Sequence, residues 1–172
     1  MTLEDSVRKK PIALGTVVCG EGSPTPSEFT IQLSKDAESE VQMADFIVTD
    51  SEPRILAAVS NILPQHLYYK MPLLVGASLS EGFELKDEAP PSASWTLMQA
   101  SVMGQFHESG FAFSGRSVRP GQKVRLASAF EIARALGLKS SGVMIGTLSS
   151  RPDVALCLDP EIFTTEHIVT SG

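Results

Sequence analysis

The sequence predicts a mainly β protein, folded as a small closed β-barrel with one short α-helix and an irregular insertion. Apolar residues alternate with a period of two over much of the first two-thirds of the 172-residue chain. Clusters of glycine and proline separate short apolar runs, and a single segment carries a helix-capping signature. Seven or more short strands favour closure, because a closed barrel leaves no unpaired edge.

The first two strands are expected at residues 12–19 and in the stretch "EFTIQL". In the latter, Phe29, Ile31 and Leu33 alternate with polar residues, as in a half-buried strand. The intervening "GEGSPTPS" resembles a phosphate-binding loop only superficially, because no lysine follows it and the next element is a strand. We therefore expect a hairpin loop there.

The middle of the chain is expected to hold strands at "DFIVTD" and "RILAAVSNIL", joined by a turn at "SEP". Residues 64–94 form the predicted insertion, with a short strand at "PLLVGASL" and an exposed acidic loop at "EGFELKDEAPPSAS". A long strand, "WTLMQASVMGQF", follows, and its Gly104 predicts a β-bulge.

The last third combines a turn, a helix and two strands. Pro120 and Gly121 suit a type II turn before the strand in "KVRLAS". Ser128 and Glu131 form a capping box for a helix that runs to Leu136 and stops at Gly137. The spacing of Phe130, Ala133 and Leu136 predicts that these three residues pack the helix on the sheet. The stretches "GVMIGTL" and "VALCLD" are expected to be a closing pair of strands.

Composition excludes several classes of protein. With 14 basic and 20 acidic residues the net charge is −6, which argues against a surface that grips a nucleic-acid backbone throughout. The N-terminal stretch has no apolar signal-peptide core, and no run approaches the roughly 20 apolar residues of a membrane span. Cys19 and Cys157 lie in strand-like runs, so we expect two buried, reduced thiols in a cytoplasmic protein with no membrane contact.

The residues by themselves indicate no active site and no metal site. His66, His107 and His167 share no metal-ligand spacing with either cysteine, and neither C-x-x-C nor H-E-x-x-H occurs. No catalytic residue is therefore predicted. The methionines at positions 43, 71, 98, 103 and 144 have two interpretations, an adaptable binding surface or plain core filling.

A basic cluster, Arg116, Arg119, Lys123 and Arg125, is the candidate interaction patch. It suits an acidic partner or nucleic acid, but a solvated strand edge charged against aggregation is favoured, because no aromatic residue interleaves it. If copies of the chain associate, this patch is predicted to face the acidic stretch 81–88 of a neighbour.

The order of short motifs resembles the N-terminal barrel of HerA-type hexameric DNA-translocating ATPases, the HAS barrel, which is itself similar to the N-terminal barrel of ATP synthase catalytic subunits. The matching residues are, in order, Gly15, Thr16 and Val17 (G-x-V), Pro120, Gly121 and Val124 (P-G-x-x-V), and, after a short helix, Ile145, Gly146 and Leu148 (I-G-x-L). The resemblance implies that residues 1–160 form the barrel.

By the same resemblance, residues 161–172 begin the strand that leads to an ATPase domain. His167 then opens that strand, and Gly172 is the first glycine of an incomplete phosphate-binding loop, G-x-x-x-x-G-K-[S/T]. No cofactor is expected in this chain, whereas ATP and magnesium are expected in the full-length parent. Residues 164–172 are predicted to be frayed here.

The implied function is that of a non-catalytic assembly and partner-docking barrel. The resemblance implies a hexameric ring in the parent, an ATP-dependent DNA helicase or translocase, with DNA passing through the ring. It also implies a nuclease or effector partner of the NurA type, in DNA end processing or defence. The isolated barrel is expected to bind DNA weakly or not at all. The alternative is a stand-alone β-barrel binding module that resembles the barrels of translation factors.

Overall fold

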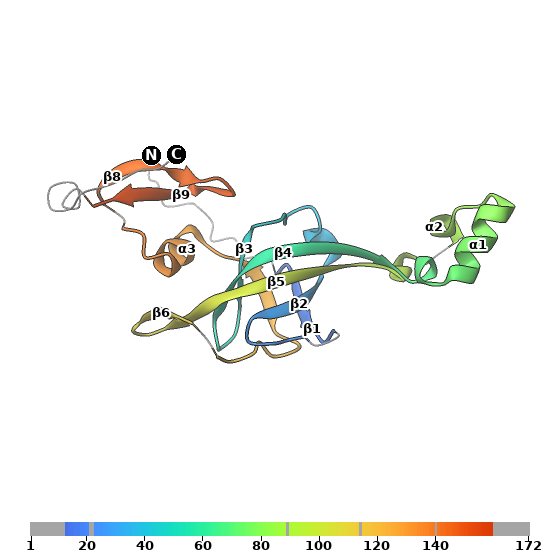
Figure 1. Ribbon diagram of the computed structural model, residues 1–172, viewed down its shortest axis with the longest axis horizontal. Coiled ribbons are helices and arrows are strands. Elements are labelled where there is room, and N and C mark those ends of the chain that lie inside the picture. The colour runs from blue at the N-terminus through green and yellow to red at the C-terminus, as the bar shows by residue number, and fades with distance from the viewer. Residues whose placement is uncertain (1–12, 21–22, 89, 114, 140, 160–172) are drawn as a thin grey trace, which may run out of the picture.

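The computed structural model describes residues 13–20, 23–88, 90–113, 115–139 and 141–159. At its centre six antiparallel strands form a closed barrel in the circular order β1-β2-β5-β4-β3-β7, completed by the pairing of β2 with β5 (Figure 1). These strands are β1 (Gly15–Val18), β2 (Glu28–Leu33), β3 (Phe46–Thr49), β4 (Ile55–His66), β5 (Ser94–His107) and β7 (Lys123–Leu126). The predicted small closed barrel is confirmed.

The predicted turns join these strands. β1 and β2 pair as a hairpin from Gly15↔Leu33 to Val18↔Thr30, so the described part of "GEGSPTPS" (residues 20 and 23–27) lies in a hairpin loop. Gly121 has a φ of +85°, and the N–H of Gln122 donates to the carbonyl of Arg119 at 3.2 Å, which is the geometry of the predicted type II turn.

A β-bulge lies next to Gly104, as predicted. Leu56 pairs with Gly104 and Ala57 with Val102, so Met103 is the extra residue of β5. Beyond the bulge β5 turns into the short β6 (Gly110–Ala112). A 3-10 turn, η1 (Lys35–Ala37), follows β2.

Two apolar clusters lie on opposite faces of the barrel wall. Ile47 of β3 and Ile55 and Ala57 of β4 point into the barrel, whereas their neighbours Val48 and Leu56 belong to an outer cluster. Successive side chains of a strand point to opposite faces, so β3 and β4 are buried on both sides. This double burial explains why their sequences read as continuous apolar runs.

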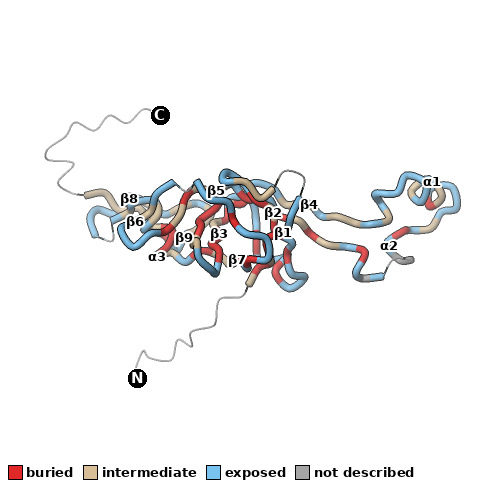
Figure 2. The backbone as a smooth tube through the Cα atoms, turned by 90° about the horizontal axis from the view of Figure 1, so that it is seen from below, coloured by how far each residue is buried: buried red, intermediate tan, exposed pale blue. Residues whose placement is uncertain are grey.

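β4 and β5 continue beyond the barrel as a two-stranded ladder that ends at the pair His66↔Ser94. Residues 67–93 cap this ladder and are called the arm tip (Figure 1). They form η2 (Tyr68–Lys70), α1 (Pro72–Glu81), α2 (Leu85–Glu88) and η3 (Pro91–Ala93). The arm tip projects from one end of the molecule in both views (Figure 2).

Within the arm tip, the expected strand at "PLLVGASL" is wrong. The stretch is helix α1, which begins with Pro72 and ends at Gly82, a left-handed residue whose N–H donates to the carbonyl of Ser78 at 2.9 Å. An eight-residue apolar run suits either a strand or a helix. The helix forms because the arm tip lies beyond the sheet, where a helix satisfies its own backbone groups. The expected acidic loop likewise contains α2.

Helix α3 (Ala129–Ala135) carries the predicted capping box. The Ser128 hydroxyl accepts from the Glu131 N–H at 3.3 Å, and the Glu131 carboxylate accepts from the Ser128 N–H at 2.9 Å. Gly137 has a φ of +65°, and the N–H of Leu138 donates to the carbonyl of Ala133 at 2.8 Å. The predicted left-handed stop at Gly137 is confirmed.

The predicted packing face of α3 is wrong. Phe130 is 74% exposed and Leu136 is exposed, whereas Ile132 is fully buried against Val48 and Leu56 in the outer cluster. The reason is that Glu131, beside Ile132, bonds to arginines of the barrel and sets the rotation of this two-turn helix.

The last two strands, β8 (Val143–Leu148) and β9 (Arg151–Leu158), form as predicted but do not close the barrel. They pair only with each other in the described chain, as a separate two-stranded sheet beside α3 (Figure 1). Val154 of β9 joins the outer cluster and fastens this hairpin to the barrel wall. The expectations for His167, Gly172 and residues 164–172 lie outside the described residues.

We predict that Gly15→Ala destabilises the barrel by about 2–3 kcal/mol, because its Cβ would lie 2.2 Å from the carbonyl oxygen of Gln32 on β2. Gly76→Ala in α1 is the matched control. Its Cβ meets nothing within 4 Å, and the change should be neutral or stabilise by up to about 1 kcal/mol. Urea unfolding followed by circular dichroism measures both. Equal midpoints for the two variants would contradict the tight β1–β2 contact.

Candidate functional site

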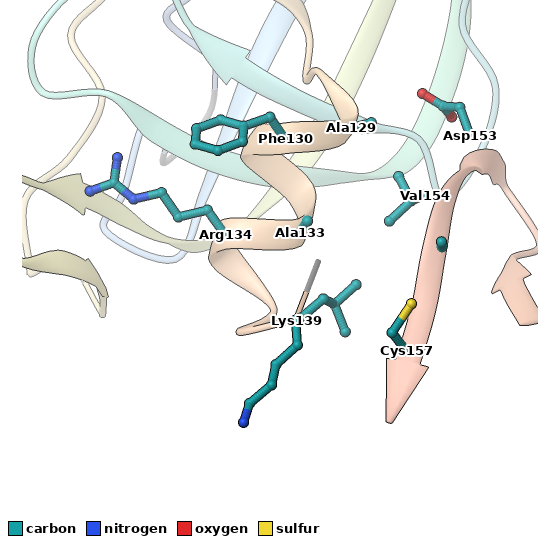
Figure 3. A pocket seen from close by; sticks show the side chains of 10 residues that line it. Ala129, Phe130, Ala133, Arg134, Lys139, Asp153, Val154 and Cys157 are labelled. Carbon is teal, nitrogen blue, oxygen red and sulfur yellow. The ribbon is translucent and has the colours of Figure 1, made fainter. Parts of the chain in front are cut away.

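A groove lies between α3 and β9, where the outer cluster reaches the surface (Figure 3). Its cavity volume is about 390 Å³. The groove is lined mainly by apolar side chains, with two cations and one carboxylate among them: Ala129, Phe130, Ala133, Arg134, Leu138, Lys139, Asp153, Val154, Ala155 and Cys157. We call α3 together with the β8–β9 hairpin the α3 corner.

A second pocket, of about 350 Å³, adjoins the groove and shares Phe130 and Arg134 with it. At its base the Glu131 carboxylate accepts hydrogen bonds from Arg125 at 2.8 and 2.9 Å, and also from Arg54. Arg125 further pairs with Asp50 at 3.1 Å. The pocket therefore holds a connected ionic network that joins the turn before β4 with β7 and α3.

Two arginines of this pocket also flank one aromatic ring. The guanidinium carbons of Arg54 and Arg134 lie 5.9 and 5.8 Å from the centre of the Phe106 ring, within cation–π range. Arg134 also donates to the carbonyl of His107 at 2.8 Å. The pocket thus presents an excess of positive charge over an apolar floor.

The network keeps Glu131 ionised. Burial opposes the charged form, but hydrogen bonds from Arg125 and Ser128 outweigh it and lower the pKa of the carboxyl from 4.5 to about 2. The hydrogen bond to Glu131 correspondingly raises the pKa of the Arg125 guanidinium. A carboxylate held in this way serves structure, because it is neither free to accept a proton near neutral pH nor open to a substrate.

The predicted basic patch is divided among three places. Arg125 is half-buried in the ionic network. Arg119 and Lys123 line a pocket with Asp50 and Glu52, and Arg116 lines another beside His107. Asp50, which pairs with Arg125, also lines the pocket of Arg119 and Lys123. Whether the four residues act as one interaction patch stays a prediction.

The expectation of two buried thiols is wrong. Cys19 is exposed after β1, and Cys157 is half-exposed in the wall of the groove. Both are free thiols. The strand-like runs end close to each cysteine, so neither thiol reaches the inner core. Of the methionines, Met98 fills the core, while Met43, Met71 and Met144 are exposed, so both interpretations apply to part of the set.

The exposed apolar side chains gather at two places. Of the thirteen large apolar residues that are exposed in the described chain, six lie on the arm tip: Leu67, Tyr69, Met71, Leu73, Leu74 and Leu79. Five lie at the α3 corner: Phe130, Leu136, Val143, Met144 and Ile145. Contiguous exposed apolar surface marks interaction sites in globular proteins.

The part of the chain that the structure describes has neither a metal-binding cluster nor a membrane-spanning helix. No group of three or more histidine, cysteine, aspartate or glutamate residues could hold a metal ion there. Nor does any helix among those residues have the length and apolarity to cross a membrane. Comparisons with protein-family models and with curated proteins find no match for this chain. The site must be interpreted from its own geometry.

Sequence inspection missed most of the α3 corner. The capping-box pattern drew attention to Glu131, but Arg54 is 77 positions away and carries no local signal. Cys157 and Arg134 likewise line one groove although they belong to different elements. Only the run "VMI" in β8, three exposed apolar residues in succession, could have indicated an unusual surface.

We predict a pH dependence that originates in Glu131. The pKa of its carboxyl is lower in the folded protein, so its stabilising contribution is present above pH 4.5 and is lost as the pH falls towards about 2. Glu131→Gln should lower the free energy of unfolding at neutral pH by about 2–3 kcal/mol and flatten the pH profile in that window. Unfolding curves at several pH values test this prediction. The exposed Glu40→Gln serves as control, and an unchanged profile in Glu131→Gln would contradict it.

Proposed function

We propose that this chain is the non-catalytic N-terminal assembly and partner-docking barrel of a HerA-type DNA-translocating ATPase. The closed barrel agrees with the architecture that the motif resemblance implies. Gly15 opens β1, the Pro120–Gly121 turn precedes β7, and Gly146 lies in β8 after the short α3. The motifs thus fall on the expected kinds of element in the expected order.

The observation that carries the proposal is the α3 corner. Its groove is lined mainly by apolar side chains, the exposed Phe130 among them, and β8 of the same hairpin exposes three further apolar residues. The charged residues beside Phe130 are engaged with one another. An enzyme pocket needs convergent polar groups free to act on a substrate. A surface with apolar anchors and a charged rim instead has the composition of a protein–protein contact.

The ionic network gives this surface the rigidity that docking requires. Arg54 and Arg125 hold Glu131, and Glu131 holds the first turn of α3. Phe130 projects from that same turn to the rim of both pockets (Figure 3). An exposed aromatic anchor on a fixed element loses little conformational entropy on binding.

In this proposal ATP and magnesium act in the domain that follows the barrel. Gly172 would then be the first glycine of the phosphate-binding loop, and the effector, a NurA-type nuclease, would act with the assembled ring. The net charge of −6 suits a barrel that leaves DNA to other parts of the ring.

We predict that the chain by itself does not bind ATP measurably in isothermal titration calorimetry. Nucleotide binding needs the lysine and hydroxyl of the complete loop, which come after Gly172 in the motif. Reading the codons that follow Gly172 completes the test. A continuation to G-x-x-x-x-G-K-[S/T] supports the proposal, and any other continuation, or ATP turnover by the chain itself, overturns it.

We further predict that Phe130→Glu weakens assembly of the full-length protein into a ring. A carboxylate at the centre of an apolar contact must be desolvated, which shifts the equilibrium by about tenfold or more. Phe113→Glu is the matched control, since Phe113 is 75% exposed but lies beyond β6, outside the α3 corner. Light scattering during size-exclusion chromatography measures the assembly. Equal effects of the two changes would remove the α3 corner from the contact.

A further inference from the structure

The two apolar surfaces lie at opposite ends of an elongated molecule. The arm tip marks one end of the long axis, and α3 with the β8–β9 hairpin lies towards the other, in both perpendicular views (Figures 1 and 2). A chain of this shape cannot bring its own two ends together, because the β4–β5 ladder holds the arm tip away from the barrel. Any contact between the two surfaces must therefore join different molecules.

Much of the apolar surface of the arm tip is exposed to solvent. Helix α1 has a single charged residue, Glu81, and its apolar residues occur all round its circumference. Leu73 is 89% exposed and Leu79 is 81% exposed. A helix that is apolar all round is normally buried. Among the side chains of the arm tip that the structure describes, Leu85 and Ala93 are the buried apolar ones, and two such residues cannot cover α1.

The α3 corner has an apolar groove that complements the exposed apolar surface of α1. Ala133 from α3 and Val154 from β9 lie on the two sides of its groove (Figure 3). Phe130 and Ala155 complete its apolar lining. A groove between a helix and a strand can accept side chains of a second helix, the recognition mode used by many amphipathic or apolar helices.

Charge favours the same pairing. By sequence, the arm tip has two lysines against four carboxylates, Glu81, Glu84, Asp87 and Glu88. The lining of the two pockets at the α3 corner has four cations, at positions 54, 125, 134 and 139, against two carboxylates, at 131 and 153. Asp50 and Asp159 pair with Arg125 and Lys139 and reduce that excess. Arg134, which makes no ion pair in the described chain, is the cation left to attract and orient the acidic arm tip.

We propose that the arm tip of one copy docks in the α3 corner of the next copy, so that the chain assembles head to tail. This inference rests on the proposed function in one respect, the role of the α3 corner as a docking surface, and it names the occupant. The contact joins two different surfaces and is heterologous, so repeated association yields a ring if the rotation closes and a filament if it does not.

This head-to-tail contact differs from the one predicted from the sequence, in which the cluster from Arg116 to Arg125 faces the stretch 81–88 of a neighbour. The acidic stretch 81–88 does lie on an exposed end. Of its predicted partner cluster, the head-to-tail contact uses Arg125, which lines the same pocket as Arg54 and Arg134.

A lipid surface is the less favoured occupant of the arm tip. Peripheral membrane helices normally have lysine and arginine on their polar face, which anionic lipids attract. Here carboxylates flank α1, and a bilayer would not use the complementary α3 corner.

Cross-linking through Cys157 tests the head-to-tail contact directly. This thiol lines the groove, and the only other cysteine, Cys19, is removed by Cys19→Ser. Leu79→Cys then places a second thiol on the arm tip. A short bismaleimide should produce a ladder of dimers, trimers and larger species, because every molecule has one thiol at each end.

Two control variants make the ladder specific. Adding Cys157→Ser to the Leu79→Cys protein leaves arm-tip thiols alone, and the ladder should disappear. Replacing Leu79→Cys by Glu38→Cys places the second thiol at an exposed position beside the barrel, and only background cross-linking should remain. Dimers that persist without Cys157 would show contact between two arm tips and would overturn the inference.

Sedimentation equilibrium of the unmodified chain gives an independent measurement. The double change Leu73→Glu and Leu79→Glu should weaken self-association by about tenfold or more, since it removes apolar anchors and adds charge. Its thermal unfolding should match that of the wild type, because both side chains are exposed in the monomer. Wild-type protein that stays monomeric at every concentration would overturn the inference.

Two further outcomes separate the inference from its alternatives. Flotation with phosphatidylcholine–phosphatidylserine vesicles that is lost in the double variant would assign the arm tip to a lipid surface and overturn the inference. If Phe130→Glu disrupts the full-length ring but no ladder forms, the proposed function stands and the inference fails. If the ladder forms but no ATPase motif follows Gly172, the inference stands and the proposed function fails.

Discussion

The outer half of this structure depends on one carboxylate, that of Glu131. It caps α3 through Ser128 and, on its other side, accepts hydrogen bonds from Arg125 and Arg54 of the barrel. A capping box normally stabilises only its own helix. Here the same group fastens the helix to the sheet, and this decides that Ile132 is buried and Phe130 is exposed. The surface proposed to dock a partner is thus a consequence of where an ion pair lies.

The barrel wall separates the main apolar core inside the barrel from the outer cluster. Its inner face encloses the main core, and the outer face of β3 and β4 packs against α3 and β9. The outer cluster is smaller and open along the groove, since a seven-residue helix and a two-stranded hairpin cannot cover it completely. Incomplete cover of this kind destabilises an isolated chain slightly, and a neighbouring molecule can remove the cost by filling the groove.

The arm tip and the α3 corner place two different apolar surfaces at opposite ends of the molecule. A barrel with one adhesive surface would form dimers at most, whereas a barrel with two different surfaces at opposite ends can propagate. The β4–β5 ladder matters here, because its pairing carries the arm tip to the end of the molecule away from the α3 corner. In the proposed assembly the closed barrel is a spacer between two contacts, a role that needs a stable fold and no chemistry of its own.

The sequence by itself determined the closed barrel, the turn at Gly121, the bulge beside Gly104 and the cap of α3, since each depends on local patterns that neighbouring residues supply. Only the tertiary structure decided that "PLLVGASL" is a helix on an arm, because an eight-residue apolar run has no preferred period and the absence of a strand to pair with is a property of the whole fold. The α3 corner was equally out of reach, since the arginine that completes the Glu131 network lies 77 residues away, and contacts over such separations are made by packing and leave no local pattern.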